Sequence, residues 1–144
     1  MRTIARLGET PLMVNCDADQ LEQVFVNMIM NAFDAMNRGG GTLRVTASSE
    51  KSSDGSRVML AFEDTGVGIA PENEARLFAP FFTTKEPGKG TGMGLAVSQS
   101  IVREHGGEIT FSSASSGSRF VVAIPMASSE IVEHEHGSRQ QRRA

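Results

Sequence analysis

A strand-like apolar run that ends in an acid and a glycine turn limits the folds open to this chain more than any other feature. Residues 58–62 read Val-Met-Leu-Ala-Phe, a pattern typical of a buried strand. Asp64 comes just after this run and is followed by Gly66 and Gly68, so the backbone there can approach a ligand closely. A carboxylate in this place can accept a hydrogen bond from an exocyclic amine, such as the amino group of adenine. Ordinary turns have the same pattern, so the rest of the chain decides between the two interpretations.

The size and charge of the chain indicate one domain with its own core. A length of 144 residues is enough for one domain, and a net charge of −3 gives no sign of a nucleic-acid binder. Cys16 is the single cysteine, which excludes an internal disulfide and favours a reducing compartment. No apolar run approaches the roughly 20 residues of a membrane span, and the N-terminus lacks the layout of a signal peptide. We therefore expect a cytoplasmic domain, or the cytosolic part of a longer, membrane-bound protein.

The first part of the chain predicts a lead-in, a short strand and a long helix. We expect residues 1–11 to lead into the domain and residues 12–14 to form a short strand. Asp17 is predicted to cap the helix, with Gln20 three residues later completing a capping box. Apolar residues then recur at helical spacing over residues 21–36, and a glycine run ends the helix.

The remaining elements are strands and two shorter helices. Residues 42–47 and 57–63 have strand-like patterns joined by a turn, which predicts an antiparallel hairpin. The further predicted elements are a short helix over 71–78, a helix over 95–105, and strands at 109–111 and 120–124. We expect the domain itself to span residues 12–127. Residues 128–144 have the composition of a disordered tail or of added sequence.

Three polar side chains lie together at the edge of the apolar face of the long helix. At about 100° per residue, Asn27, Asn31 and Asp34 fall within roughly 60° of one another. Amides and acids next to a core can be buried only when something pairs with them. A solvated polar face is the ordinary explanation for such a group, but two asparagines one helical turn apart favour a specific role.

A glycine-rich loop precedes the second long helix and has the features of a phosphate site. Residues 79–94 contain four glycines and two prolines, and loops of this length in compact domains are often lids or binding loops. The Gly-x-Gly-x-Gly of residues 90–94 runs into the start of a helix, where free backbone N–H groups and the helix dipole bind phosphate. Lys85 and Lys89 add positive charge to the same loop. A flexible hinge is the alternative interpretation of this loop.

Taken in order, these motifs resemble the successive boxes of the GHKL ATP-binding superfamily, which includes histidine kinases, gyrase-type and chaperone ATPases and mismatch-repair ATPases. The match spans residues 12–125 and comprises the helix Gln23-x3-Asn27-x3-Asn31-Ala32-x-Asp34-Ala35, then Asp64-x-Gly66-x-Gly68, Phe78-x-Pro80-Phe81 and Gly90-x-Gly92-x-Gly94. The segments Phe-Phe-Thr-Thr-Lys, Gly-Thr-Gly-Met-Gly-Leu and Ile-Val-x-x-His-Gly-Gly are similar to the catalytic domains of two-component sensor kinases. The nitrogen-regulation and dicarboxylate-sensing branch of these kinases is the most similar.

The resemblance implies a Bergerat-type two-layer α/β sandwich, in which a mixed, mostly antiparallel sheet packs on helices. It also implies that the domain binds ATP and Mg²⁺. Asp64 would accept a hydrogen bond from adenine and repel the carbonyl of guanine, Asn31 would give an amide oxygen to Mg²⁺, and Ser118 would help to bind adenine through water. Phe81, Phe82 and the glycine loop would form a lid over ATP. The implied nucleotide-binding residues are Asn31, Asp34, Asp64, Gly66, Gly68, Ile69, Phe81, Phe82, Thr83, Thr84, Lys85, Lys89, Gly90, Thr91, Gly92, Met93, Gly94, Leu95 and Ser118.

Two residues depart from the pattern of the superfamily. Where the ATP-hydrolysing branches have a glutamate that activates water, this chain has Asn27, and an amide cannot act as a general base. This favours phosphoryl transfer to another protein over hydrolysis, with Asn27 and Asn31 as the catalytic pair. Where some histidine kinases have a lysine that contacts phosphate, this chain has Asp34, so Lys85 or Lys89 is expected to supply the positive charge.

The resemblance implies a protein histidine kinase domain that needs a second domain to act. The sequence has no helix hairpin with an acceptor histidine, and His105 lies in the His-Gly-Gly turn. The implied partners are therefore a dimerisation and phosphotransfer domain and, indirectly, a response regulator, with no nucleic acid and no direct membrane insertion. Two alternatives are a stand-alone anti-sigma-type serine kinase of the same fold and a catalytically silent nucleotide-binding interaction module.

Overall fold

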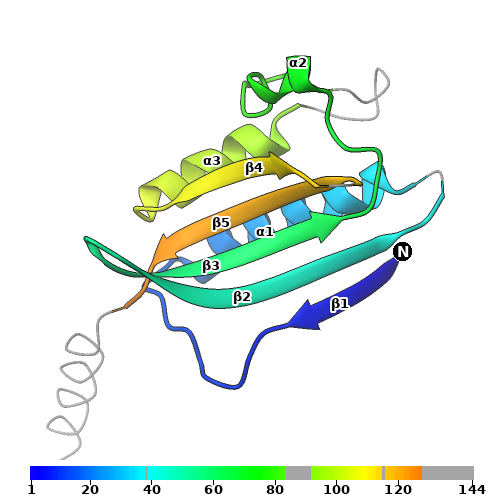
Figure 1. The fold of residues 1–144 in the computed structure, drawn as a ribbon. Coiled ribbons are helices and arrows are strands. Elements are labelled where there is room, and N and C mark those ends of the chain that lie inside the picture. The colour runs from blue at the N-terminus through cyan, green and yellow to red at the C-terminus, as the bar shows by residue number, and fades with distance from the viewer. Residues whose placement is uncertain (38, 84–91, 115, 128–144) are drawn as a thin grey trace, which may run out of the picture.

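In the part of the chain that the structure describes, five strands form one mixed sheet, and two long helices pack against one face of it (Figure 1). The structure is a computed structural model and describes residues 1–37, 39–83, 92–114 and 116–127. None of its described helices is both long and apolar enough to cross a membrane. The elements are β1 (Arg2–Arg6), α1 (Ala18–Ala35), β2 (Thr42–Ser52), β3 (Gly55–Asp64), α2 (Pro71–Glu74), α3 (Gly94–Glu104), β4 (Glu108–Ser113) and β5 (Ser118–Pro125).

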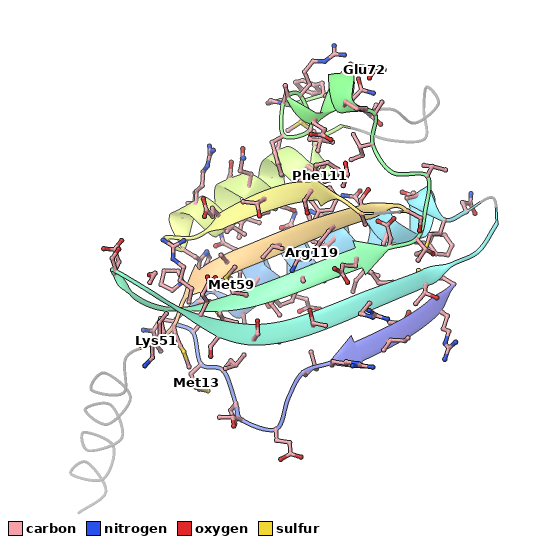
Figure 2. All side chains as sticks on the ribbon, viewed as in Figure 1. Met13, Lys51, Met59, Glu72, Phe111 and Arg119 are labelled. Atoms are coloured by element: carbon pink, nitrogen blue, oxygen red, sulfur yellow. The ribbon has the colours of Figure 1, made fainter. Side chains whose placement is uncertain are left out.

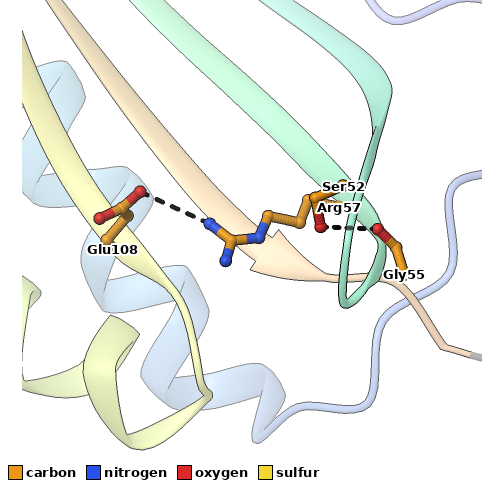
Figure 3. A network of polar contacts seen from close by, with 4 residues as sticks. All are labelled: Ser52, Gly55, Arg57 and Glu108. Carbon is orange, nitrogen blue, oxygen red and sulfur yellow. Dashed lines mark hydrogen bonds and ion pairs between the residues drawn. The ribbon is translucent and has the colours of Figure 1, made fainter.

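The strand order in the sheet is β1-β2-β3-β5-β4. β1 is parallel to β2, and the other neighbouring pairs are antiparallel. β2 and β3 form the hairpin that the sequence predicts, and at its turn the Ser52 hydroxyl donates to the Gly55 carbonyl oxygen at 2.8 Å (Figure 3). The prediction of a two-layer α/β fold with a mixed, mostly antiparallel sheet is confirmed.

The N-terminal residues differ from the sequence prediction. Residues 2–6, expected as part of a lead-in, form β1 and pair with β2. The short strand predicted at residues 12–14 is wrong, because these residues lie outside every strand of the described chain. The Met13 carbonyl oxygen instead accepts one backbone hydrogen bond from Ala127 at 2.8 Å. β1 is an edge strand in which only Ile4 is partly buried, so no alternating apolar pattern marks it in the sequence.

Helix α1 begins where the sequence predicts but forms only half of the expected capping box. The Asp17 side chain accepts a hydrogen bond from the Gln20 backbone N–H at 3.1 Å, which satisfies one free donor of the first turn. The reciprocal bond to the Asp17 backbone N–H does not come from Gln20. That N–H donates instead to Nε2 of His105 at 3.0 Å, so a distant side chain takes the place of the glutamine.

The core lies between the sheet and the faces of α1 and α3 that are turned toward it. Along α1 the residues Leu21, Val24, Met28 and Ala32 recur every three to four positions, which places them on one face. Burial of one large side chain of this kind contributes about 1.5–3 kcal/mol. The largest fully buried apolar side chains are Met28, Leu43, Ile124, Val24, Val102 and Val122.

The short helix predicted over residues 71–78 is shorter in the structure. α2 ends at Glu74, has Pro71 in its first turn, and is followed by turns. Leu77 is buried in the core, and Phe78 packs edge-on against Phe120 of β5, with ring centroids 6.5 Å apart. The segment that leads into the glycine loop is therefore fixed to the core although it is not helical.

The other face of the sheet, which we call the outer face, is turned away from the helices. Alternation along β5 directs Val121 to this face, since its neighbours Phe120 and Val122 belong to the core. Figure 2 shows Arg119 on the outer face, where it pairs with Glu63 of β3 at 3.0 Å. A second ion pair joins β3 to β4 at 3.5 Å, between Arg57 and Glu108 (Figure 3). Partly exposed ion pairs of this kind add little to stability.

Candidate functional site

Asp64 is a buried carboxylate at the end of β3, and the following turn is built around it. The residue is only 6% exposed. Its Oδ1 accepts hydrogen bonds from the backbone N–H groups of Gly66 at 2.9 Å and Ser118 at 3.3 Å. Burial raises the pKa of the Asp64 carboxyl above its ordinary value, and the two backbone hydrogen bonds oppose this rise. The arrangement gives a fixed, buried hydrogen-bond acceptor that a ligand can use.

Two glycines leave the space that this arrangement needs. A Cβ on Gly66 would lie 2.5 Å from the Ala35 carbonyl oxygen of α1, and a Cβ on Gly117 would clash with the backbone of Asp64. The Val67 N–H also donates to the Ala35 carbonyl oxygen at 3.1 Å. The turn after β3 is therefore packed directly on the C-terminal end of α1.

The two asparagines of α1 have different surroundings. Nδ2 of Asn27 donates to the Gly94 carbonyl oxygen at 3.2 Å and to Ser98 Oγ at 3.0 Å, so it joins α1 to α3. Nδ2 of Asn31, one turn later, is buried and has no hydrogen-bond partner among the described residues. A buried polar atom without a partner is costly. Asn31 therefore has the property expected of a ligand contact, whereas Asn27 already has protein partners.

The start of α3 is held against the segment that precedes the glycine loop. The Phe81 N–H donates to the Gly92 carbonyl oxygen at 2.9 Å, and a Cβ on Gly92 would clash with the Phe81 backbone. Phe81 has a φ of +66°, which is unusual for a bulky residue, and it is 76% exposed. No described side chain caps α3 at Gly94, so its first backbone N–H groups can bind a ligand.

The structure brings part of the predicted site together. The predicted residues that surround the turn after β3 are Asp64, Gly66, Gly68 and Ser118. Ile69 and Leu95 are partly buried and pack against the core. Asp34 and Thr83 are exposed, and the Phe82 ring lies 5.0 Å from the guanidinium of Arg76. The predicted residues outside the described part of the chain are Thr84, Lys85, Lys89, Gly90 and Thr91.

A groove of about 390 Å³ runs between α1 and α3. Its lining comprises Gln20, Gln23, Pro80, Met93, Ala96, Val97, Ser100, Ile101 and Glu104. Met93 is the one predicted nucleotide-binding residue among these, and the turn after β3 contributes no side chain. We therefore identify the candidate nucleotide site by the buried Asp64 and not by this groove.

The sequence did not predict a role in the site for Ser98 of α3 or for His105, the residue just after α3. Ser98 is fully buried and accepts the hydrogen bond of Asn27, and His105 accepts that of the Asp17 N–H. Both are polar residues at helical spacing from the buried Ile101. A polar side chain within an apolar helical stripe was the available signal, because such a residue needs a partner when it is buried.

A single sequence family covers the whole described site. It is described as "Histidine kinase-, DNA gyrase B-, and HSP90-like ATPase", and it matches residues 16–128 of the chain. The chain belongs to this ATPase family. The match contains α1, the turn after β3 and the start of α3, and the GHKL resemblance seen in the sequence is confirmed.

Relatives of this ATPase-family chain include bacterial sensor kinases. It is 44% identical over 118 residues to the two-component sensor PprA of Pseudomonas aeruginosa, covering 81% of this chain and 13% of PprA. It is 41% identical to the sensor histidine kinase ZraS of Salmonella typhimurium, covering 83% of this chain and 24% of ZraS. It is also 41% identical to sporulation kinase C of Bacillus subtilis, covering 81% and 26%. The chain thus spans about a quarter of the length of these relatives, or less.

Solved histidine kinase structures share the fold. The nucleotide-free catalytic domain of histidine kinase ThkA matches with a TM-score of 0.74 at 30% identity, covering 86% of this chain and 79% of that one. Full-length ShkA in complex with AMPPNP matches with a TM-score of 0.73 at 27% identity, covering 89% of this chain and 26% of ShkA. The sheet and helices described above are therefore arranged as in histidine kinase catalytic domains.

Proposed function

We propose that this ATPase-family domain binds Mg-ATP and donates the γ-phosphoryl group to a histidine on a separate dimerisation domain. The observation that supports this most is the buried Asp64 carboxylate, which two backbone N–H groups hold at the turn packed on α1. Protein histidine kinase activity also fits the relatives, which are named as sensors and kinases. The domain would be the catalytic, ATP-binding part of a two-component sensor.

Asp64 would select adenine over guanine. The amino group of adenine can donate to the carboxylate, whereas guanine has a carbonyl at the same place, and two acceptors cannot share a hydrogen bond. Because Asp64 is buried, an unpaired contact of this kind cannot be relieved by water. Ser118, whose N–H donates to the same carboxylate oxygen as the Gly66 N–H, would help to bind adenine through a water molecule.

Asn31 fits the role of a magnesium ligand. Its buried amide nitrogen has no partner among the described residues, and an amide can turn its oxygen to the same place. Mg²⁺ prefers oxygen ligands and keeps several waters, so one protein ligand beside the phosphates is a typical arrangement. The described residues contain no cluster of three or more His, Cys, Asp or Glu side chains that could hold a metal instead. Bound Mg²⁺ would neutralise charge on the phosphates.

The phosphates would bind at the start of α3, beneath the glycine loop. Backbone N–H groups near Gly92 and Gly94 would point at them. Phe81, Phe82 and the loop would act as the lid, and Lys85 or Lys89 would supply positive charge. The Phe81 N–H donates to the Gly92 carbonyl oxygen, so the described residues on the two sides of this loop are held together. This supports a lid whose two ends are fixed.

Asn27 would act by placing the start of α3. Its Nδ2 donates to the Gly94 carbonyl oxygen, so it fixes the helix start that would hold the phosphates. An amide cannot remove a proton from water, which favours transfer to a protein acceptor over hydrolysis. Positioning and charge neutralisation supply most of the catalysis in phosphoryl transfer, so Asn27 and Asn31 need no acid–base role.

The partners and the location belong to the same proposal. This chain spans 13–26% of the relatives named above, so other segments of such a protein would provide the acceptor histidine and the dimerisation domain. A response regulator would then take the phosphoryl group from that histidine. The catalytic domain itself would work in the cytoplasm, without contact to nucleic acid.

Transfer between separate molecules is the direct test. The domain is incubated with ATP labelled on its γ-phosphate and with a dimerisation hairpin from the parent protein, and the label on the hairpin is measured. We expect acid-labile label on the wild-type hairpin and none on a hairpin whose acceptor histidine is replaced by alanine. A domain that binds ATP but never labels the hairpin would contradict the transfer step, and acid-stable label would point to a hydroxyl acceptor.

A further inference from the structure

His105 joins α1 and α3 at the end of the helix pair opposite Asn27. Its Nδ1 lies 2.7 Å from the Ile101 carbonyl oxygen, and its Nε2 lies 3.0 Å from the Asp17 backbone nitrogen. A carbonyl oxygen only accepts and a backbone N–H only donates, so the ring has its proton on Nδ1 and a lone pair on Nε2. We call these two hydrogen bonds the His105 link, and they require the neutral ring.

The helix pair is held at both ends. Residues 17–27 of the α1 region run alongside residues 105–94 of the α3 region, because Asp17 meets His105 and Asn27 meets Gly94 and Ser98. Ten residues separate the two connections on α1, which is about 15 Å of helix. Both helices also pack in the shared core, and two polar connections oppose a pivot of one helix on the other more than one connection would.

The relative position of the helices matters for the candidate nucleotide site. Asn31, the proposed magnesium ligand, lies on α1, and Gly94, at the start of α3, lies by the proposed phosphate site. A pivot of α3 about its contact with Asn27 would turn the backbone N–H groups at the start of α3 to a different direction relative to Asn31. The His105 link lies at the far end of the pair and opposes this motion without touching the nucleotide.

The elements that meet at this end of the helix pair carry charged residues of both signs. These residues are Asp17 and Asp19 of the α1 start, Arg103 and Glu104 of the last turn of α3, and Glu108 of β4. The C-terminus of a helix favours a cation, but the Asp17 N–H faces Nε2 and opposes one. A protonated ring keeps its bond to Ile101 and loses its bond to Asp17, so protonation separates α1 from the ring.

We propose that His105 is a positioning residue for ATP binding, and that its neutral form fixes α1 against α3 while protonation releases that contact. This role rests on the proposed function of the domain. An imidazolium has no lone pair on Nε2 to accept from the Asp17 N–H, so the link would make ATP affinity fall when the ring takes up a proton. The effect is one of geometry, since His105 contacts neither ATP nor metal in this proposal.

Two substitutions of His105 distinguish the loss of the hydrogen-bond acceptor from the loss of the titrating ring. In His105→Gln a side-chain carbonyl reaches the place of Nε2, accepts from the Asp17 N–H and does not titrate. In His105→Asn the amide is too short to reach Asp17. We expect the Asn variant to bind ATP about fivefold more weakly near pH 8, the equivalent of one net hydrogen bond. On acidification the wild type should lose about the same factor in ATP affinity relative to His105→Gln, and comparing the two proteins at each pH cancels the titration of ATP itself.

A matched control distinguishes positioning from general loss of stability. Val121→Ala removes a buried side chain from the outer face of β5, away from both helices, and should lower the melting temperature without changing the Kd for ATP. NMR of the His105 ring nitrogens, together with hydrogen exchange of the Asp17 amide, reports the link without any nucleotide. We expect a protonated Nδ1, an unprotonated Nε2 and a protected amide.

Three results would overturn the proposal: the other tautomer near pH 8, wild-type ATP affinity in His105→Asn, or a wild-type pH profile in His105→Gln. A wild-type domain that binds no ATP would overturn the proposed function and this role with it. The ring-nitrogen measurement would still reveal whether the link itself exists, so the two failures are distinguishable.

Discussion

At the scale of single residues, the ionised Asp64 carboxylate would lower the stability of the free domain and would provide the hydrogen-bond acceptor for the ligand. Burial raises the pKa of its carboxyl, so the folded chain holds this proton more tightly than the unfolded chain does. The resulting contribution to stability is complete at low pH and is lost as the pH rises through the raised pKa. At neutral pH the ionised carboxylate is therefore a cost to the fold, and an adenine amino group would offset it.

Asp64→Asn should abolish ATP binding and leave the domain at least as stable as the wild type at neutral pH. The amide keeps an oxygen for the N–H groups of Gly66 and Ser118 and has no charge to bury, but its NH₂ would face the amino group of adenine. Chemical denaturation measured from about pH 4 to pH 8 tests the sign, since only the wild type should lose stability as the carboxyl ionises. A variant much less stable than the wild type at neutral pH would contradict this account of Asp64.

The losses of unfolding free energy caused by removing Asn27 and Ser98 should not add, because the two side chains share one hydrogen bond. Ser98→Ala removes the acceptor at 3.0 Å and should cost about 1 kcal/mol of unfolding free energy, as should Asn27→Ala. The double variant should cost clearly less than the sum, because each single change already removes the shared bond. Urea denaturation of all four proteins gives the coupling, and Ser100→Ala, on the exposed side of α3, is the matched control. Strict additivity would mean that the two side chains do not interact in solution.

At the scale of elements, the start of α1 depends on the Asp17 side chain, which accepts from the Gln20 N–H. Asp17→Ala should lower the unfolding free energy by about 1 kcal/mol, a typical loss for an N-cap. Asp17→Asn is the control, because asparagine caps a helix as well as aspartate does and leaves the backbone N–H for His105. Thermal unfolding compares the three proteins, and a loss of equal size in both variants would show that charge and not capping matters.

Elements whose physical signal is local could be predicted from the sequence, and those that depend on a distant partner could not. The cap at Asp17 and the hairpin turn at Gly55 follow from nearby residues. β1 could not be predicted, because an exposed edge strand has no apolar alternation and gains its pairing from β2. Asp64 could be proposed as a site residue from the sequence, because the apolar run before it and the glycines after it are its neighbours. The contact between His105 and Asp17 could not be predicted, because it joins residues 88 positions apart.

At the scale of the whole molecule, the fold brings three chain segments to one place. The end of β3 supplies Asp64, the turn that follows is packed on the C-terminal end of α1, and Asn27 joins α1 to the start of α3. Each connection lies between elements far apart in the sequence, so the site exists only in the complete fold. Any ligand that binds it should therefore stabilise the whole domain, by about 2.7 kcal/mol at a hundredfold excess over its Kd.

The central claim is that one purine nucleotide binds against Asp64, and titration calorimetry with ATP and GTP in the presence of Mg²⁺ tests it most directly. The wild-type domain should bind ATP and bind GTP at least about a hundredfold more weakly, since Asp64 accepts from adenine alone. Asp64→Asn should not bind ATP, because its NH₂ would face the amino group of adenine. Equal affinities for ATP and GTP, or unchanged ATP binding in Asp64→Asn, would contradict the account.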